Sequence, residues 1–245
     1  MNNQTFLETE IPYDSFDRMG FSQEMIDDLP ESIMDKLLSG DKTPLLASKI
    51  NDNNGNPMRA CIWLERNENG TVEAMYRPYD NVRDFSEFSK SEQKTLLNGG
   101  VVRTTLKDNV PSYYQMDEQT NRILSCPVDC LKNNIDGFVQ NFAHVDVKRF
   151  EDGKPQTLQE GENAITFGID LSDSKGFRFV NGTEVDWKEE KSKENLPKYN
   201  FGIYGCWTVD NDNNLSYVSE ENYTDDIVKA QNELVENNKS RGMHM

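Results

Sequence analysis

Histidine, basic side chains and long apolar runs are scarce in this chain of 245 residues. Its two histidines, His144 and His244, leave little material for a nucleophilic site that depends on an imidazole base. The longest purely apolar run, residues 60–64, is far shorter than the roughly 20 residues that a membrane-spanning helix needs. The amino terminus lacks the basic and apolar regions of a secretory signal. We therefore expect a cytoplasmic protein without membrane contact, and we identify no catalytic residue and no cofactor motif.

Cysteine is also scarce, and its spacing indicates no metal centre. In a cytoplasmic chain, the cysteines at positions 61, 126, 130 and 206 are expected to be reduced thiols. Cys126 and Cys130 have three residues between them, and no second cysteine pair completes a zinc site. We expect these thiols to be small buried side chains or strand-end residues.

Acidic residues outnumber basic ones by 43 to 26, and the net charge is −17. Most of this charge lies in two segments: residues 1–35 carry −8 and residues 209–236 carry −7. A protein that binds nucleic acid directly needs the opposite sign, so the charge argues against such binding. The acidic ends could attract a basic protein partner or imitate nucleic acid, or they could only confer solubility.

A stretch that predicts a helix, a glycine and then a strand recurs along the chain. Residues 29–46, LPESIMDKLLSGDKTPLL, carry this pattern, residues 89–106 carry it again, and residues 155–169 carry a weaker copy. Glycine adopts the left-handed conformation that ends a helix at no steric cost. The predicted helix-stop residues are Gly40, Gly99 and Gly161, which lie 59 and 62 residues apart.

Asn-Gly turns and alternating apolar residues predict antiparallel strands after each of these helices. The expected strands are residues 44–50, 58–66 and 71–79, then 101–106, 112–117 and 122–128, then 164–171 and 177–180. A carboxyl-terminal hairpin of residues 201–209 and 215–219 is expected to precede a helix at 224–237. We therefore predict an α+β fold of repeated units, each a short helix and an antiparallel hairpin or meander, with a hairpin-helix module at the end. The expected domains are residues 1–110, 111–190 and 191–245.

The segment IPYDSFDRMGFSQEMIDDLPESIMDKLLSGDKTPLL, residues 11–46, resembles the start of a domain of unknown function. That domain recurs in polyvalent proteins of bacterial conjugative elements and phages, where a helix of the form L-P-x-x-x-h-x-x-L-L-x-G-x-K-T precedes a β-rich region. Residues 88–100, FSKSEQKTLLNGG, are similar to the recurring helix-then-glycine element of the family. The resemblance covers residues 11–185 and implies a mobile-element or phage origin with an accessory binding role.

Two ligand motifs match only in part. Residues 39–43 suggest a phosphate-binding loop, but that loop requires a preceding strand and a second glycine, whereas here a helix comes first. A calcium loop would use Asp210, Asp212, Asn214, Ser216 and Glu221, yet Leu215 stands at its glycine position. A hairpin turn is the better interpretation of this second segment.

A metal-dependent nuclease would require a pair of carboxylates near a lysine, and Asp170, Asp186 and Lys188 occur in that order. A pattern of this kind has little specificity in a chain with 43 acidic residues. Otherwise, Asp186 and Lys188 belong to a solvated linker.

Aromatic residues near the carboxyl-terminal hairpin suggest a protein-binding surface, since aromatic side chains dominate binding hot spots. The candidate interaction residues are Trp187, Tyr199, Tyr204, Trp207, Asp210, Asp212, Glu220 and Glu221. The leading hypothesis is a non-catalytic interaction protein, an acidic inhibitor of a host defence factor or of a nucleic-acid-binding protein. The alternatives are a structural virion or cargo component and a metal-dependent nuclease, and the sequence does not determine the oligomeric state.

Overall fold

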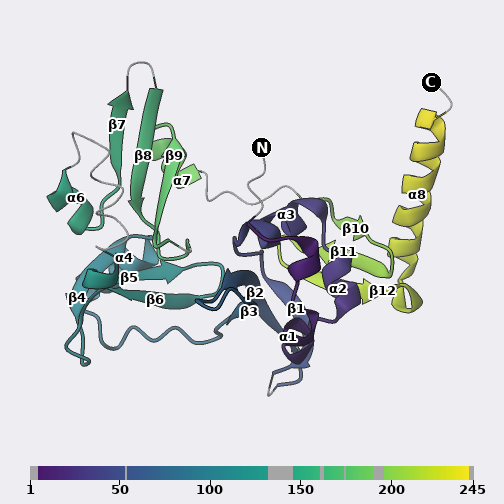
Figure 1. Cartoon of the computed structure of the whole chain (residues 1–245), viewed down its shortest axis with the longest axis horizontal. Coiled ribbons are helices and arrows are strands. Elements are labelled where there is room, and N and C mark those ends of the chain that lie inside the picture. The colour runs from purple at the N-terminus through teal and green to yellow at the C-terminus, as the bar shows by residue number, and fades with distance from the viewer. Residues whose placement is uncertain are drawn as a thin grey trace. The chain divides into compact units, whose positions relative to one another are not determined.

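The computed structural model describes residues 5–52, 54–131, 146–160, 163–173, 175–189 and 196–242. The chain has the predicted α+β class, and the described strands form one six-stranded and two three-stranded sheets (Figure 1). It divides into two compact units. The terminal unit comprises Met1–Pro78 and Glu194–Met245, and the central unit comprises Tyr79–Lys193.

The six-stranded sheet of the terminal unit combines strands from both ends of the chain. Its strands in spatial order are β10 (Tyr199–Phe201), β11 (Gly205–Val209), β12 (Leu215–Ser219), β1 (Leu46–Asn51), β2 (Pro57–Arg66) and β3 (Val72–Pro78). β12 and β1 pair in parallel, with Leu215 opposite Leu46, and the other neighbours are antiparallel. The hairpin expected within a separate domain at 191–245 therefore completes the sheet that the amino-terminal strands begin. The division into two units differs for this reason from the three consecutive domains expected.

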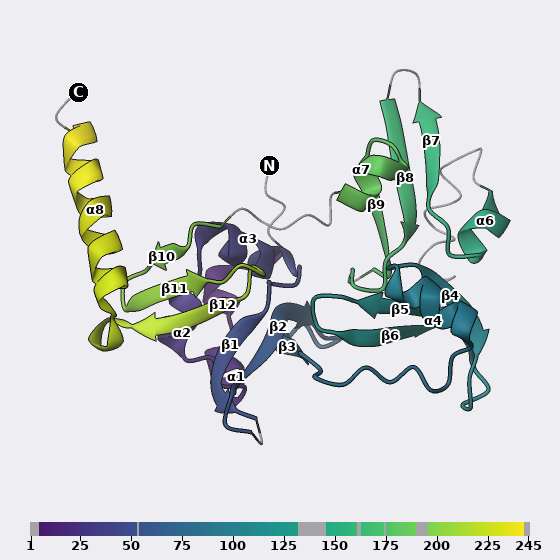
Figure 2. The same cartoon turned by 180° about the vertical axis from the view of Figure 1, so that it is seen from behind.

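The helical segments of the terminal unit are η1 (Glu8–Glu10), α1 (Tyr13–Arg18), α2 (Gln23–Asp27), α3 (Glu31–Ser39), η2 (Glu220–Asn222) and α8 (Asp225–Gly242). Helices α1, α2 and α3 cover one face of this sheet and enclose its core, whereas α8 lies beside the edge strand β10 (Figure 2). Ile33, Leu37 and Leu38 form the apolar stripe of α3 and are almost fully buried. They pack in one cluster with Ile62 of β2 and Trp207 of β11, so α3 shares a core with strands from both ends of the chain.

The central unit contains two antiparallel sheets, each preceded by a short helix. The first group is α4 (Lys90–Leu97), β4 (Val101–Thr105), β5 (Pro111–Asp117) and β6 (Arg122–Pro127). The second is α6 (Val147–Glu151), β7 (Gln156–Glu160), β8 (Asn163–Ile169), β9 (Phe177–Asn181) and α7 (Glu184–Glu189). Gln115 of β5 links them, because its side-chain oxygen accepts from the Leu171 N–H at 2.7 Å. A shared apolar cluster that includes Tyr113 and Phe167 packs the two sheets together.

Left-handed glycines end α3 and α4 with the same hydrogen bonds. Gly40 has a φ of 80° and its N–H donates to the carbonyl of Leu37, while the next N–H donates to Lys36. Gly99 has a φ of 72° and bonds in the same way to Leu96. These are the closing bonds of a Schellman motif, which satisfies carbonyl groups at a helix end.

The third helix stop predicted from the sequence is misplaced. Gly161 lies outside the described residues, and the helix expected just before it is wrong, because Gln156–Glu160 forms strand β7. Gly153, with a φ of 73°, instead ends α6, and its N–H donates to Phe150 at 2.8 Å. Pairing of β7 with β8 outweighs a helical pattern that is only a few residues long.

None of the described helices is both long enough and apolar enough to cross a lipid bilayer.

Candidate functional site

The best-connected buried carboxylate of the terminal unit belongs to Asp28, which follows α2 and is 3% exposed. Its Oδ1 accepts a hydrogen bond from the Ile203 N–H at 2.6 Å, and its Oδ2 accepts from the Tyr204 N–H at 2.9 Å. The Tyr217 hydroxyl donates to the same Oδ2 at 2.6 Å. A buried carboxylate is tolerated when several donors satisfy it, as they do here. Asp28 therefore fastens the turn between β10 and β11 to the segment between α2 and α3.

Glycine is required beside this carboxylate. A Cβ atom on Gly202 would lie 2.2 Å from the Cγ of Asp28, far inside contact distance. The absent side chain lets the main chain wrap closely around the carboxylate, so that two consecutive N–H groups can reach it. No local pattern in the sequence pairs Asp28 with Gly202, since the two residues come from distant parts of the chain.

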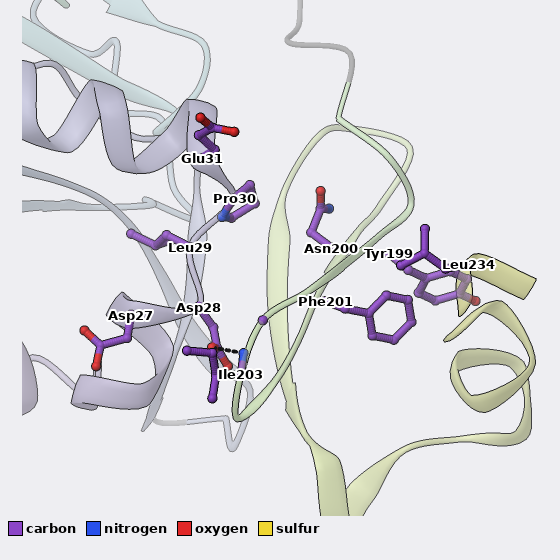
Figure 3. Close-up of a pocket in the computed structure, with 11 residues that line it drawn as sticks. Asp27, Asp28, Leu29, Pro30, Glu31, Tyr199, Asn200, Phe201, Ile203 and Leu234 are labelled. Atoms are coloured by element: carbon purple, nitrogen blue, oxygen red, sulfur yellow. Dashed lines mark hydrogen bonds between the residues drawn. The ribbon is translucent and has the colours of Figure 1, made fainter. Parts of the chain in front are cut away.

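A cavity of about 360 Å³ lies next to the hydrogen-bonded carboxylate of Asp28 (Figure 3). We call it the β10 pocket, and it is lined by residues 27–31, residues 199–203 and Leu234. Figure 3 shows Pro30 and Glu31 on the side of α3, with Tyr199 and Phe201 directed towards α8 on the other side. The pocket therefore has walls from helices at both ends of the chain.

The β10 pocket combines carboxylates with exposed apolar side chains. Glu31 is exposed, and the half-buried Asp27 accepts a hydrogen bond from the Tyr13 hydroxyl at 2.6 Å. Ile203 is 79% exposed and Leu234 is 50% exposed. Apolar surface beside the exposed carboxylate of Glu31 is suited to a ligand with both apolar and cationic parts.

Two of the predicted interaction residues are buried, so the expectation that they lie in an exposed surface is wrong. Trp207 is 0% exposed, and its Nε1–H donates to the Met25 carbonyl at 3.0 Å. Trp187 is 9% exposed and carries the Arg178 guanidinium 4.0 Å from its ring centroid. Large aromatic rings bury the most apolar area, and the sequence did not reveal that Trp207 faces the covered side of its sheet or that Trp187 lies on the covered side of α7.

The other predicted aromatics remain accessible. Tyr199 is half-buried in the wall of the β10 pocket, and Tyr204 is 48% exposed just beyond it. Trp187 belongs to the central unit and the two tyrosines to the terminal unit. The structure thus brings Tyr199 and Tyr204 near one pocket and leaves Trp187 out of that set.

The predicted acidic interaction residues lie in two places near β12. Glu220 and Glu221 are exposed in η2. Asp210 and Asp212 occupy the turn between β11 and β12, where the Asp210 carboxylate accepts from the N–H groups of Asp212 and Asn214, both at 2.9 Å. The segment is thus a hairpin turn organised by an aspartate side chain, in agreement with the interpretation preferred over a calcium loop.

The residues of the nuclease hypothesis have structural partners. Asp170 is 2% exposed and accepts from the Arg178 Nε at 3.0 Å. Asp186 accepts from the Thr183 N–H at 2.7 Å at the start of α7, and bonds to Thr183 hold the pKa of Asp186 below its usual range. Within the described ranges, no group of three or more His, Cys, Asp or Glu side chains could hold a metal ion.

The cysteines should differ in their reactivity with iodoacetamide at about pH 8. Cys130 is exposed, whereas Cys61 and Cys206 are buried, and burial raises the pKa of Cys206 to about 11. Because the thiolate is the nucleophile, Cys206 would present only about 0.1% of the reactive form. We expect Cys130 to be alkylated first, Cys126 more slowly, and the buried pair only after unfolding.

Peptide mapping by mass spectrometry after timed quenching would measure these four rates. A guanidinium-unfolded sample is the control, since all four thiols should then react alike. Alkylation of native Cys206 as fast as that of Cys130 would contradict the burial described for β11.

Comparison with protein-family models, with curated proteins and with solved structures finds no match for this chain.

Proposed function

We propose that this chain is a non-catalytic interaction protein that binds a basic protein partner at the β10 pocket. The observation that carries the proposal is the β10 pocket itself, a 360 Å³ cavity where the exposed Glu31 adjoins the apolar side chains of Phe201, Ile203 and Leu234. Interfaces gain affinity from buried aromatic and aliphatic anchors and gain specificity from complementary charge. A lysine- or arginine-rich surface with apolar side chains would supply both.

The charge distribution supports a basic partner. Residues 1–35 and residues 209–236 carry −8 and −7 and are distant in sequence, yet both belong to the terminal unit. The fold therefore gathers most of the net charge of −17 on one unit. The negative electrostatic potential of this unit raises the association rate with a cationic partner and repels nucleic acid.

The resemblance to domains of conjugative elements and phages suggests which partner this would be. We propose a mobile-element or phage origin, and a host defence factor or nucleic-acid-binding protein as the target, with carboxylates taking the place of phosphates. The order of helix, left-handed glycine and three strands at α3, α4 and α6 supports a second proposal, that the chain is built from repeated units. Within the described residues, no observation favours the structural-component or nuclease alternatives.

A charge reversal in the β10 pocket tests the proposal. Glu31→Lys should weaken binding to a basic partner, captured from a bacterial host lysate and then purified, by about tenfold or more. Isothermal titration calorimetry would give the dissociation constants. Raising the ionic strength from about 0.05 to 0.3 M should weaken binding of the parent protein as well, because salt screens exposed charges.

Glu68→Lys provides the matched control. Glu68 is exposed in the turn between β2 and β3, away from the β10 pocket, and its replacement changes the net charge by the same amount. It should leave the affinity within about twofold of the parent value. Equal losses for the two variants would show that net charge alone drives binding, and a salt-independent affinity would remove the electrostatic basis of the proposal.

A further inference from the structure

β10 is an edge strand whose outer main-chain groups can be identified from its pairing. Asn200 lies opposite Trp207, and hydrogen bonds from Val209 N–H to the Lys198 carbonyl and from Gly202 N–H to the Gly205 carbonyl flank that pair. In an antiparallel ladder, every second residue directs its N–H and C=O groups towards the neighbouring strand. Residues 198, 200 and 202 therefore face β11, and the N–H and C=O groups of Tyr199 and Phe201 face away from it. Among the described strands, β10 pairs only with β11.

The β10 pocket lies along this edge and has a different wall on each face of the sheet. Asn200 shares a face with Trp207, which packs against α2 in the core. Tyr199 and Phe201 occupy the opposite face, where the ring of Phe201 lies 6.0 Å from that of Tyr223. Figure 3 shows the corresponding separation of Asn200 from the two aromatic side chains.

The two walls have different chemistry. The wall on the side of α2 and α3 carries the exposed carboxylate of Glu31, whereas the carboxylate of Asp27 points away from β10 and accepts hydrogen bonds from Tyr13 and Gln23. The wall on the side of α8 consists of Tyr199, Phe201 and the half-exposed Leu234. The unpaired edge of β10 thus lies between an acidic wall and an apolar wall.

We infer that the β10 pocket binds an extended segment of a basic protein, which adds to the sheet as a further strand beside β10. The inference rests on the proposed function and specifies its binding mode. Main-chain groups of Tyr199 and Phe201 would pair with the added strand, as in other cases of strand addition. Since successive side chains of a strand point to opposite faces, one set would meet Glu31 and the other set Leu234. The preferred segment therefore alternates lysine or arginine with aliphatic or aromatic residues.

Charge disfavours a second copy of this chain as the occupant. Pairing of two β10 edges would bring the Glu31 carboxylates of both copies to one interface, in a protein of net charge −17. Like charges across a strand pair destabilise it. A basic segment relieves this repulsion, whereas a second acidic chain increases it.

Synthetic peptides test the strand addition directly. The probe is a fluorescent peptide of about nine residues, a common strand length, that alternates lysine and valine. Two further forms carry N-methyl groups, one on every lysine and the other on every valine. Only one of these sets of N–H groups can face β10, so one N-methylated form should lose affinity by about thirtyfold and the other should stay within about threefold. Equal affinities of the two N-methylated forms, retained or lost, would overturn strand addition.

Hydrogen exchange on the protein gives an independent readout. Peptide binding should slow exchange of the Tyr199 and Phe201 amides, which face the edge, and should leave that of Asn200, already bonded to β11, nearly unchanged. Leu234→Asp and Glu31→Lys should each weaken binding by about tenfold, while Glu68→Lys should not. Unchanged exchange at Tyr199 and Phe201 on saturation with the peptide would contradict the binding mode.

A block peptide with the same composition, lysines first and valines second, separates failure of this mode from failure of the proposed function. Equal, salt-dependent binding of the block and alternating peptides would leave the basic-partner proposal standing and remove strand addition. Absence of binding by both peptides at low salt would count against both the strand addition and the basic-partner proposal.

Light scattering of the protein alone would reveal concentration-dependent dimers. Dimers that are lost in Leu234→Asp would assign the edge of β10 to a second copy of the chain instead.

Discussion

Replacement of Trp207 by alanine is expected to lower the free energy of unfolding of the terminal unit by about 3–5 kcal/mol. The side chain is 0% exposed, and its ring meets Tyr217 edge-on at a centroid distance of 5.3 Å. Truncation would leave a large cavity between α2 and β11, and the Met25 carbonyl would lose its donor. Guanidinium unfolding followed by far-UV circular dichroism would measure the change.

Two controls separate this core role from a role in binding. Trp207→Phe keeps an aromatic ring but removes the hydrogen bond to Met25, so it should cost less than the alanine variant. Tyr204→Ala removes an exposed side chain and should change stability by no more than about 0.5 kcal/mol. If Trp207→Ala unfolded at the parent midpoint but bound the partner weakly, Trp207 would be an interface residue after all.

Asp28→Ala is expected to cost about 2–4 kcal/mol, because it removes the acceptor of three partly buried hydrogen bonds at once. The N–H groups of Ile203 and Tyr204 and the hydroxyl of Tyr217 would all lose their partner. Hydrogen exchange at Ile203 and Tyr204 should accelerate strongly, and the unfolding midpoint should fall. Since this turn forms one side of the β10 pocket, partner binding should weaken in the same variant.

Neighbouring replacements serve as controls for Asp28. Asp28→Asn keeps one acceptor oxygen and should cost less than the alanine variant. Asp27→Ala removes the hydrogen bond with Tyr13 and should cost about 1 kcal/mol. Equal stability of Asp27→Ala and Asp28→Ala would contradict the stabilising role of the three hydrogen bonds to Asp28.

The dependence of folding stability on alkaline pH tests the same hydrogen-bonded cluster through the hydroxyl of Tyr217. Burial, together with the hydrogen bond to Asp28, raises the pKa of Tyr217 above its ordinary value. The folded state therefore holds the phenol proton more tightly than the unfolded chain, whose tyrosines titrate near about pH 10. This contribution to stability is complete below about pH 10 and declines as the pH rises further.

Local patterns allowed prediction of features that depend on neighbouring residues. The stripe of Ile33, Leu37 and Leu38 follows helical periodicity, and these side chains are buried as such a stripe requires. The turn after Asp210 and the left-handed Gly40 likewise express chemistry within a few residues. The α+β class follows from adding such segments together.

The candidate site could be predicted only in part. Tyr199 and Tyr204 were singled out from their type and position, and they line or adjoin the β10 pocket. The same grounds indicate Trp187 and Trp207, which are buried, because residue type does not reveal which side of a strand or helix will be covered. In the sequence, Asp28 is one of many acidic residues and nothing local marks its role, although its hydrogen bonds hold the turn at Ile203 and Tyr204 in place.

The sequence by itself determined the α+β class, the helix ends at Gly40 and Gly99, the hairpins, and the acidic charge of both ends of the chain. Only the tertiary structure decided that those ends form one unit, through the pairing of Leu46 with Leu215. It also decided that the N–H groups of Ile203 and Tyr204 meet the carboxylate of Asp28. The physical reason is that periodicity and turn chemistry act over a few residues, whereas these contacts join distant segments. Their stability depends on burial and loop closure across the whole fold.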